Sequence, residues 1–74
     1  LHFIITLLYG NLVAGQRQGE GRVIYANGDV YEGDFADDLR DGQGTFTGAD
    51  EFVYTGSWVA GQIEGQGTVT YPDK

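Results

Sequence analysis

Cysteine and methionine are absent from this 74-residue chain, and only four basic residues stand against eleven acidic ones. Without cysteine the chain has no disulfide and no thiolate metal site, which fits a cytoplasmic protein and excludes no other compartment. The formal net charge is −7. Because nucleic acids and anionic membranes are bound by clustered lysine and arginine, and the few basic residues here are scattered, we expect neither as a direct partner.

Residue types that carry catalysis are scarce as well. His2 is the single histidine and Ser57 the single serine, so a nucleophile, a base and an orienting group cannot be assembled. The Gly-x-Gly pairs lack the third glycine of a dinucleotide-binding loop, no helical pattern follows them, and no Walker lysine is present. The sequence therefore predicts no enzyme, no catalytic residue and no cofactor.

Acidic residues concentrate in the middle of the chain, where eight of the eleven lie between Asp29 and Glu51. Asp37, Asp38 and Asp41 could offer oxygens to Ca²⁺, but they lack the alternating ligands and the bidentate glutamate of an EF-hand loop. We interpret the acids as a solvated face that maintains solubility and protects strand edges. No metal site is predicted, and the alternative is a basic partner attracted to this face.

Glycine, by contrast, is abundant and recurs at a fixed period. Gly19-Glu20-Gly21 returns as Gly42-Gln43-Gly44 and, after the same interval, as Gly65-Gln66-Gly67. The motif from Tyr31 to Phe35 returns at that interval from Tyr54 to Trp58. Such a period indicates stacked repeats, in which each unit buries its apolar face against its neighbours. We expect one domain over residues 1–74, with a leading strand at 1–7 and units at about 8–30, 31–53 and 54–74.

Apolar and polar residues alternate within each unit. Tyr31, Gly33 and Phe35 fall on one face of an extended strand and the residues between them on the other, which is typical of a half-buried antiparallel strand. Asn27-Gly28 predicts a type I′ hairpin turn. The expected fold class is all-β: an antiparallel meander of successive β-hairpins, about six strands in a single-sheet solenoid, with no helix longer than one turn.

The strand glycines need a physical reason, since glycine weakens a strand interior. We expect each large ring to lie flat over a neighbouring strand at a glycine, where no Cβ is in the way. The rings of Phe46, Phe52 and Tyr71 are expected to join this core. The residues predicted to form the repeat core are Tyr31, Gly33, Phe35, Gly42, Gly44, Tyr54, Gly56, Trp58, Gly65 and Gly67.

Tyr-x-Gly-x-(Trp/Phe), a short polar turn and Gly-x-Gly-x-(aromatic or Val), repeated at this fixed interval, resembles the MORN repeat over the chain beyond about Leu8. The first unit departs from the pattern, with Leu8 for the tyrosine and Leu12 for the tryptophan. The resemblance implies a non-enzymatic module for protein–protein interaction or scaffolding, with a protein partner of unknown identity. The alternatives are membrane-lipid association, which the charge of −7 opposes, and a regulatory repeat segment of a larger enzyme.

The opening run Leu1–Tyr9 is strongly apolar, but spanning a bilayer takes roughly 20 residues. A strand is expected, the alternative being a truncated targeting segment of a longer protein. Alternation assigns Phe3, Ile5, Leu7 and Tyr9 to one face and Ile4 and Leu8 to the other. Because both faces are apolar, we predict a homo-oligomer through this strand about a two-fold axis. The interaction candidates are Phe3, Ile5, Leu7, Tyr9, Tyr25 and Tyr71.

Overall fold

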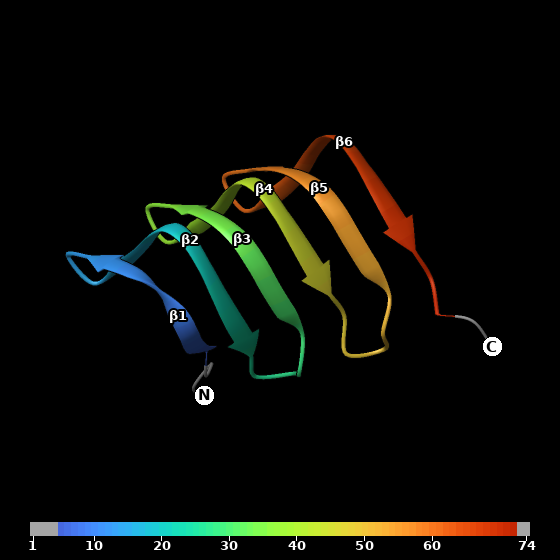
Figure 1. Cartoon of the computed structure of the whole chain (residues 1–74), viewed down its shortest axis with the longest axis horizontal. Helices are drawn as coiled ribbons and strands as arrows, with labels where there is room; N and C mark the ends of the chain where they lie inside the picture. The colour runs from blue at the N-terminus through green and yellow to red at the C-terminus, as the bar shows by residue number, and fades with distance from the viewer. Residues whose placement is uncertain (1–4, 73–74) are drawn as a thin grey trace.

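Residues 5–72 of the computed structural model form one antiparallel sheet of six strands in chain order (Figure 1). The strands are β1 (Ile5–Val13), β2 (Gln16–Tyr25), β3 (Val30–Ala36), β4 (Leu39–Thr47), β5 (Val53–Val59) and β6 (Gln62–Thr70). This architecture confirms the predicted all-β meander of hairpins. Over the described residues, no helix is present that could cross a membrane.

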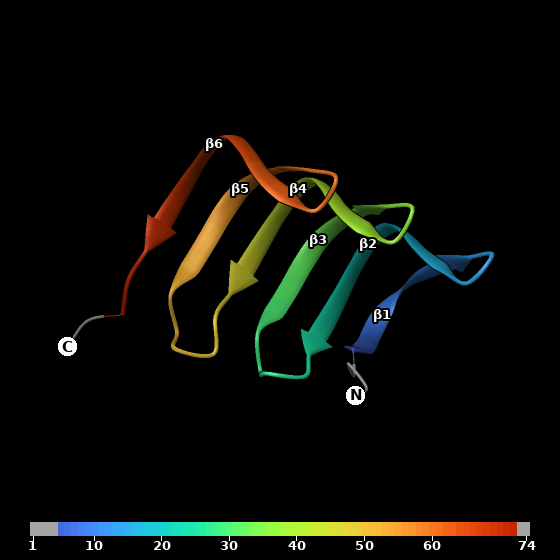
Figure 2. The ribbon, with the colours of Figure 1, turned by 180° about the vertical axis from the view of Figure 1, so that it is seen from behind.

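One row of glycines crosses the whole sheet. The register pairs each member with the next on the neighbouring strand, in the order Gly10, Gly21, Gly33, Gly44, Gly56 and Gly67. Figure 1 and Figure 2 show that the hairpins bend about midway, so the sheet curves into an open trough. A row without side chains lets neighbouring backbones and rings approach closely where this curvature is needed.

The core lies on the concave side of the trough and consists of the buried side chains Val23, Tyr31, Phe35, Tyr54 and Trp58. The ring of Tyr31 meets Phe35 edge-on at 5.1 Å and Trp58 at 5.5 Å between centroids. Tyr31 precedes the glycine row along its strand, whereas Phe35 and Trp58 follow it. Contact between them therefore requires the sheet to fold toward this face, and each such ring pair adds about 0.5–1.5 kcal/mol beyond area burial.

The second glycine of each Gly-x-Gly pair provides room for a tyrosine. A Cβ on Gly44 would overlap the Tyr31 ring, and one on Gly67 would lie 2.5 Å from Cζ of Tyr54. Tyr31 reaches across the glycine row of its own strand, and its hydroxyl donates to the Asp34 carbonyl at 2.8 Å. The predicted close approach of rings to strand glycines is therefore present at both positions.

The first glycine of each pair has a different role from the one predicted. The expected place of Gly42 and Gly65 on the ring-bearing face is wrong, because both have positive φ, 107° and 77°, at a β-bulge. A Cβ on Gly42 would meet the carboxylate of Asp34 rather than a ring. The same carboxylate accepts a hydrogen bond from the backbone N–H of Gln43 at 3.1 Å. Opposite Asp34 the strand β4 has two extra residues, and the positive φ of Gly42 directs a Cβ at this position toward the Asp34 carboxylate.

Turn chemistry also differs from the prediction at one site. The type I′ turns, with two consecutive positive φ values, are Ala14-Gly15, Asp37-Asp38 and Ala60-Gly61 within the units. At the predicted site only Gly28 has positive φ, and its N–H donates to the Tyr25 carbonyl at 3.0 Å. The type I′ prediction for Asn27-Gly28 is therefore wrong, because a longer connection ending in a glycine bulge joins β2 to β3.

The face assignment of the first strand is wrong beyond Leu7. Leu7 pairs with the buried Val23, but Tyr9 pairs with the exposed Arg22, because Leu8 forms a bulge between them. Tyr9 consequently lies on the convex face, opposite the side of Leu7. The bulge places aliphatic and aromatic side chains on both faces in a way that simple alternation cannot reproduce.

Alkaline pH is expected to destabilise the fold through Tyr31. Burial, with a smaller contribution from Asp34, raises the pKa of this hydroxyl from 10.0 to about 12. The stability that depends on the neutral hydroxyl is thus complete below pH 10.0 and is lost as the pH rises toward the folded-state pKa. Urea unfolding should show a weaker alkaline dependence for Tyr31→Phe than for the wild type. The exposed-residue control Tyr71→Phe should keep the wild-type dependence, and equal slopes for all three proteins would contradict the assignment.

Candidate functional site

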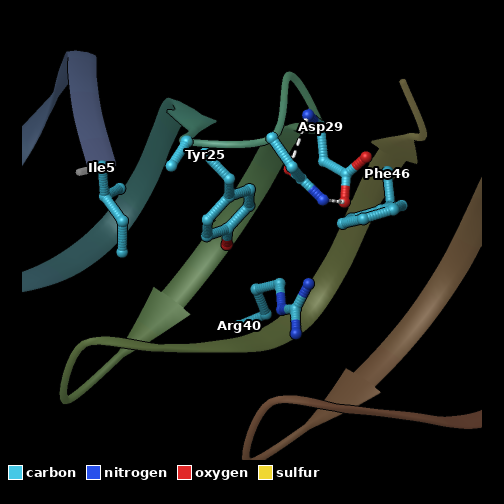
Figure 3. A pocket seen from close by; sticks show the side chains of 7 residues that line it. Ile5, Tyr25, Asp29, Arg40 and Phe46 are labelled. Atoms are coloured by element: carbon cyan, nitrogen blue, oxygen red, sulfur yellow. Dashed lines mark hydrogen bonds between the residues drawn. The ribbon is translucent and has the colours of Figure 1, made fainter. Parts of the chain in front are cut away.

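The concave face contains a hollow of about 570 Å³ beside the core (Figure 3). Its lining comes from the start of β1, the β2–β3 connection and β4, so segments that are far apart in sequence build it together. The lining residues are Ile5, Tyr25, Ala26, Asn27, Asp29, Arg40 and Phe46.

Two aromatic side chains form the apolar wall of this hollow. Tyr25 and Phe46 have ring centroids 6.4 Å apart, and Phe46 continues to Phe52 at 6.0 Å. Tyr25 is also the direct cross-strand partner of Ile5. These side chains are held at fixed positions by the sheet, so the surface that they form is pre-organised.

Among the described residues, Arg40 is the basic group in the lining. Its Cζ lies 4.6 Å from the ring centroid of Trp58, 5.5 Å from that of Phe46 and 5.7 Å from that of Tyr25. One guanidinium nitrogen donates to the Gly61 carbonyl at 3.1 Å. The cation is therefore held against ring faces, an arrangement worth about 0.5–2 kcal/mol, and within residues 5–72 its side chain makes the one hydrogen bond to Gly61.

Arg17 occupies, one unit earlier, the repeat position of Arg40, and it is paired with a carboxylate. Its Cζ lies 5.1 Å from the Phe35 ring, and its Nε donates to Oδ1 of Asp38 at 2.5 Å. The hydrogen bonds from the Arg17 side chain and backbone lower the pKa of the Asp38 carboxyl. In the next unit Gly61 stands where Asp38 stands, so over residues 5–72 Arg40 has no carboxylate within salt-bridge distance.

Sequence reasoning missed both arginines because it judged basic residues by their number and found them scattered. The available signal was the period itself, since Arg17 and Arg40 are separated by one repeat interval. Each joins its unit to the next through the backbone as well: the Arg17 carbonyl accepts from the Asp38 N–H at 3.0 Å, and the Arg40 carbonyl accepts from the Gly61 N–H at 2.8 Å.

Asp29 is the acidic group in the lining, and its oxygens are already engaged in the fold. Oδ1 accepts from the Ala49 backbone N–H at 2.8 Å and Oδ2 from the Asn27 side-chain amide at 2.9 Å. The carboxylate thus ties the β2–β3 and β4–β5 connections together. Its hydrogen bonds explain why an acid lies near the hollow without pairing with Arg40.

The six predicted interaction residues are only partly brought together. Ile5 and Tyr25 both line the hollow, and Leu7 is half-buried and packs against the core. Phe3, like Ile4, lies outside the described residues.

Tyr9 and Tyr71 lie away from this group. Tyr9 is on the convex face, where its hydroxyl donates to the carboxylate of Glu32, a contact that raises its pKa. Tyr71 follows the end of β6 and is 76% exposed, so its expected place among the core rings is wrong. A strand that ends the sheet has no neighbour whose glycine could receive the ring.

The acidic residues singled out from the sequence serve separate structural contacts. Asp37 accepts from the side-chain amide of Gln18 at 2.8 Å, and Asp41 accepts from the backbone N–H of Ala60 at 3.1 Å. Within residues 5–72, no three acidic or histidine side chains gather closely enough to hold a metal ion. These acids connect one unit to the next and lie apart from the hollow.

The three hairpins all match the same protein-family model. The family model for the MORN repeat matches residues 9–30, 31–51 and 54–74, so each match spans one hairpin of the sheet. No curated protein matches the sequence as a relative.

Proposed function

The chain belongs to the MORN-repeat family, and we propose that it is a non-enzymatic protein-binding module whose concave hollow receives a segment of a partner protein. MORN repeats are modules commonly found in binding or association.

The observation that supports it is the unpaired cation on an aromatic wall. Arginine and tyrosine are among the side chains that most often dominate binding energy at protein interfaces, and Arg40 and Tyr25 face the same hollow. An extended segment with one large apolar side chain would contact Tyr25 and Phe46. A carboxylate beside that side chain would give Arg40 the partner that Asp38 gives Arg17.

Electrostatics restrict the partner further. The chain carries a net charge of −7, so a strongly acidic partner would be repelled over a distance of about one Debye length, roughly 8–10 Å. The expected segment is therefore apolar with a single carboxylate rather than polyacidic. Lipid association is the rival function, and its anionic headgroups face the same repulsion without an apolar side chain to fill the hollow.

Panning a phage-displayed peptide library on the purified chain tests the proposal. Enriched peptides should carry an aromatic or large aliphatic residue next to Asp or Glu. Arg40→Gln should weaken their binding by about tenfold or more. The matched control is Arg22→Gln, which removes the same charge from the exposed convex face and should leave binding unchanged.

Since Arg40 also contacts Trp58, each variant is first checked for its unfolding free energy. Tyr25→Ala provides a second change in the hollow that leaves the arginine in place. Failure to enrich any peptide, or equal loss in Arg40→Gln and Arg22→Gln, would contradict the proposal. Sedimentation with phosphatidylserine vesicles tests the alternative function, lipid association. If the chain binds these vesicles and Arg22→Gln abolishes that binding, lipid association replaces the proposal.

A further inference from the structure

We propose that copies of this chain stack head to tail, with β6 of one copy pairing antiparallel to β1 of the next. The proposal concerns the two edges of the sheet and is independent of what occupies the concave hollow. Over the described residues, β1 pairs only with β2 and β6 only with β5, so each presents one unpaired edge.

These edges carry almost no charge and no proline to oppose pairing. Edge strands are commonly blunted by charged side chains or proline, yet the nine residues of β1 contain neither, and the nine of β6 contain only Glu64. Large apolar side chains are exposed along both, and they include Leu12 and Val13 on β1 and Ile63 and Val69 on β6. The two edges therefore resemble surfaces that are covered rather than surfaces that face water.

Inside the chain, units meet at two junctions, β2 with β3 and β4 with β5, and both use the same contact. An arginine of one unit stacks on an aromatic ring of the following unit, Arg17 on Phe35 at 5.1 Å and Arg40 on Trp58 at 4.6 Å. The junction thus depends on a matched pair of side chains, one from each side.

At the outer edges both members of this pair change together. Ile63 stands one repeat interval after Arg40 and occupies the arginine position, while Leu12 stands one interval before Phe35 and occupies the ring position. They are 54% and 58% exposed. If a second copy continues the stack, Ile63 meets Leu12, so an aliphatic contact replaces the cation and the ring. A change on only one edge would have left a mismatch.

The backbone features of a junction are retained at the edges as well. Gly10 of the next copy would extend the glycine row beyond Gly67, because the register and the alternating strand direction both continue. Gly15 would present its N–H to the Ile63 carbonyl, as Asp38 does to Arg17 and Gly61 does to Arg40.

On the convex face, pairing of β6 with β1 of the next copy would also bring two polar side chains together. Gln43 and Ser57 are cross-strand partners joined by a 2.7 Å hydrogen bond, and the corresponding residues at the edges are Gln66 and Asn11. Head-to-tail pairing therefore repeats a junction that the chain already makes twice.

This geometry differs from the two-fold association predicted from the first strand. Joining β1 to β1 would leave Ile63 and Val69 on β6 uncovered. A head-to-tail contact uses two different surfaces and does not close on itself unless the stack curves into a ring. Open-ended growth is the expected consequence, and it distinguishes the two arrangements in solution.

Cysteine cross-linking tests the pairing directly, because the chain has no cysteine of its own. Asn11→Cys and Gln66→Cys place thiols at positions that would be direct cross-strand partners, within the roughly 5.5 Å Cα separation that a disulfide tolerates. An oxidised mixture of the two variants should give a two-chain product, and each variant alone should give none. The double variant should give a ladder of longer products.

The matched control is Gln43→Cys mixed with Asn11→Cys, since Gln43 has the same repeat position as Gln66 but is paired inside the chain. This mixture should give no product. A disulfide dimer from Asn11→Cys alone would replace the proposal with two-fold pairing. No product from any combination at high micromolar concentration would end it.

Sedimentation equilibrium provides a second test that needs no new thiol. Ile63→Asp should reduce the average mass of the wild-type assembly to that of the 8.0 kDa monomer. Val59→Asp is its control, since Val59 is exposed to a similar degree but lies on the interior strand β5. A wild type that is already monomeric, or equal effects of the two variants, would overturn the proposal.

Discussion

Gly44→Val is expected to unfold most of the chain at room temperature. A Cβ at this position would overlap the hydroxyl and ring carbons of Tyr31, and Tyr31 is fully buried. The ring cannot move aside because Phe35 and Trp58 meet it edge-on at 5.1 and 5.5 Å. Overpacking costs about 1–3 kcal/mol where side chains can adjust, and here we expect the upper end or more.

Such a loss is large for a chain of this size, because stability amounts to roughly 0.05–0.15 kcal/mol per residue. The measurement is urea unfolding followed by far-UV circular dichroism. Gly67→Val should also destabilise, since Tyr54 covers Gly67 in the same way, but less, because within the chain β6 is held by a strand on one side only.

Gln43→Val is the control for this prediction. Gln43 is the neighbour of Gly44 on the same strand, but it is exposed on the opposite face. The substitution removes its hydrogen bond to Ser57 and adds a β-branched side chain that strands favour, so we expect a change within about 0.5 kcal/mol. Equal destabilisation by Gln43→Val and Gly44→Val would show that the two faces are assigned wrongly.

The pairing of ring and glycine could be predicted from the sequence because it depends only on short-range alternation and on the period. Tyr31 and Gly44 both recur one repeat interval later as Tyr54 and Gly67. A feature repeated at a fixed interval has the same neighbours in every interior unit, so one physical reason serves all copies. For this reason the fold class and the positions of the Tyr31 and Tyr54 rings could be predicted from the sequence.

Bulges limited the prediction of faces. Alternation with period 2 assigns each residue of a strand to a face once the face of one residue is known. A single extra residue therefore reverses the face of every residue that follows it. Leu8 is such an insertion, and the error at Tyr9 follows from it. The error at Gly42 follows instead from its positive φ, in a stretch where β4 has two extra residues opposite β3. The type I′ error at Asn27-Gly28 has a different cause, since dipeptide preference does not fix the number of residues in a connection.

The hollow could not be predicted because its components come from different units. Arg40 and Phe46 lie on β4, Tyr25 ends β2 and Ile5 begins β1, and only the curvature of the sheet brings them to one surface. The prediction of partners also considered only the net charge of the chain. The net value of −7 concealed that Arg17 has a carboxylate partner whereas Arg40 has an aromatic wall in its place.

Trp58→Ala is expected to be the most damaging truncation in the chain, at about 3–5 kcal/mol. The indole meets Tyr54 edge-on at 5.4 Å and Tyr31 at 5.5 Å, so it joins the rings of two successive units. Arg40 lies 4.6 Å from its ring centroid, and its Nε1 donates to the Gly44 carbonyl at 3.4 Å. Removing it leaves a cavity bounded by side chains that the backbone holds apart.

Phe35→Ala and Tyr71→Ala are the two variants with which the stability of Trp58→Ala should be compared. Phe35 has the same repeat position and is also buried, but among the described residues its ring pairs with one aromatic ring, that of Tyr31, and with Arg17, so its truncation should cost less than that of Trp58. Tyr71 is largely exposed, and its truncation should stay within about 0.5 kcal/mol. Far-UV circular dichroism in urea compares all three without relying on the indole. If Phe35→Ala costs as much as Trp58→Ala, burial alone sets the stability, and the ring contacts between units add nothing beyond it.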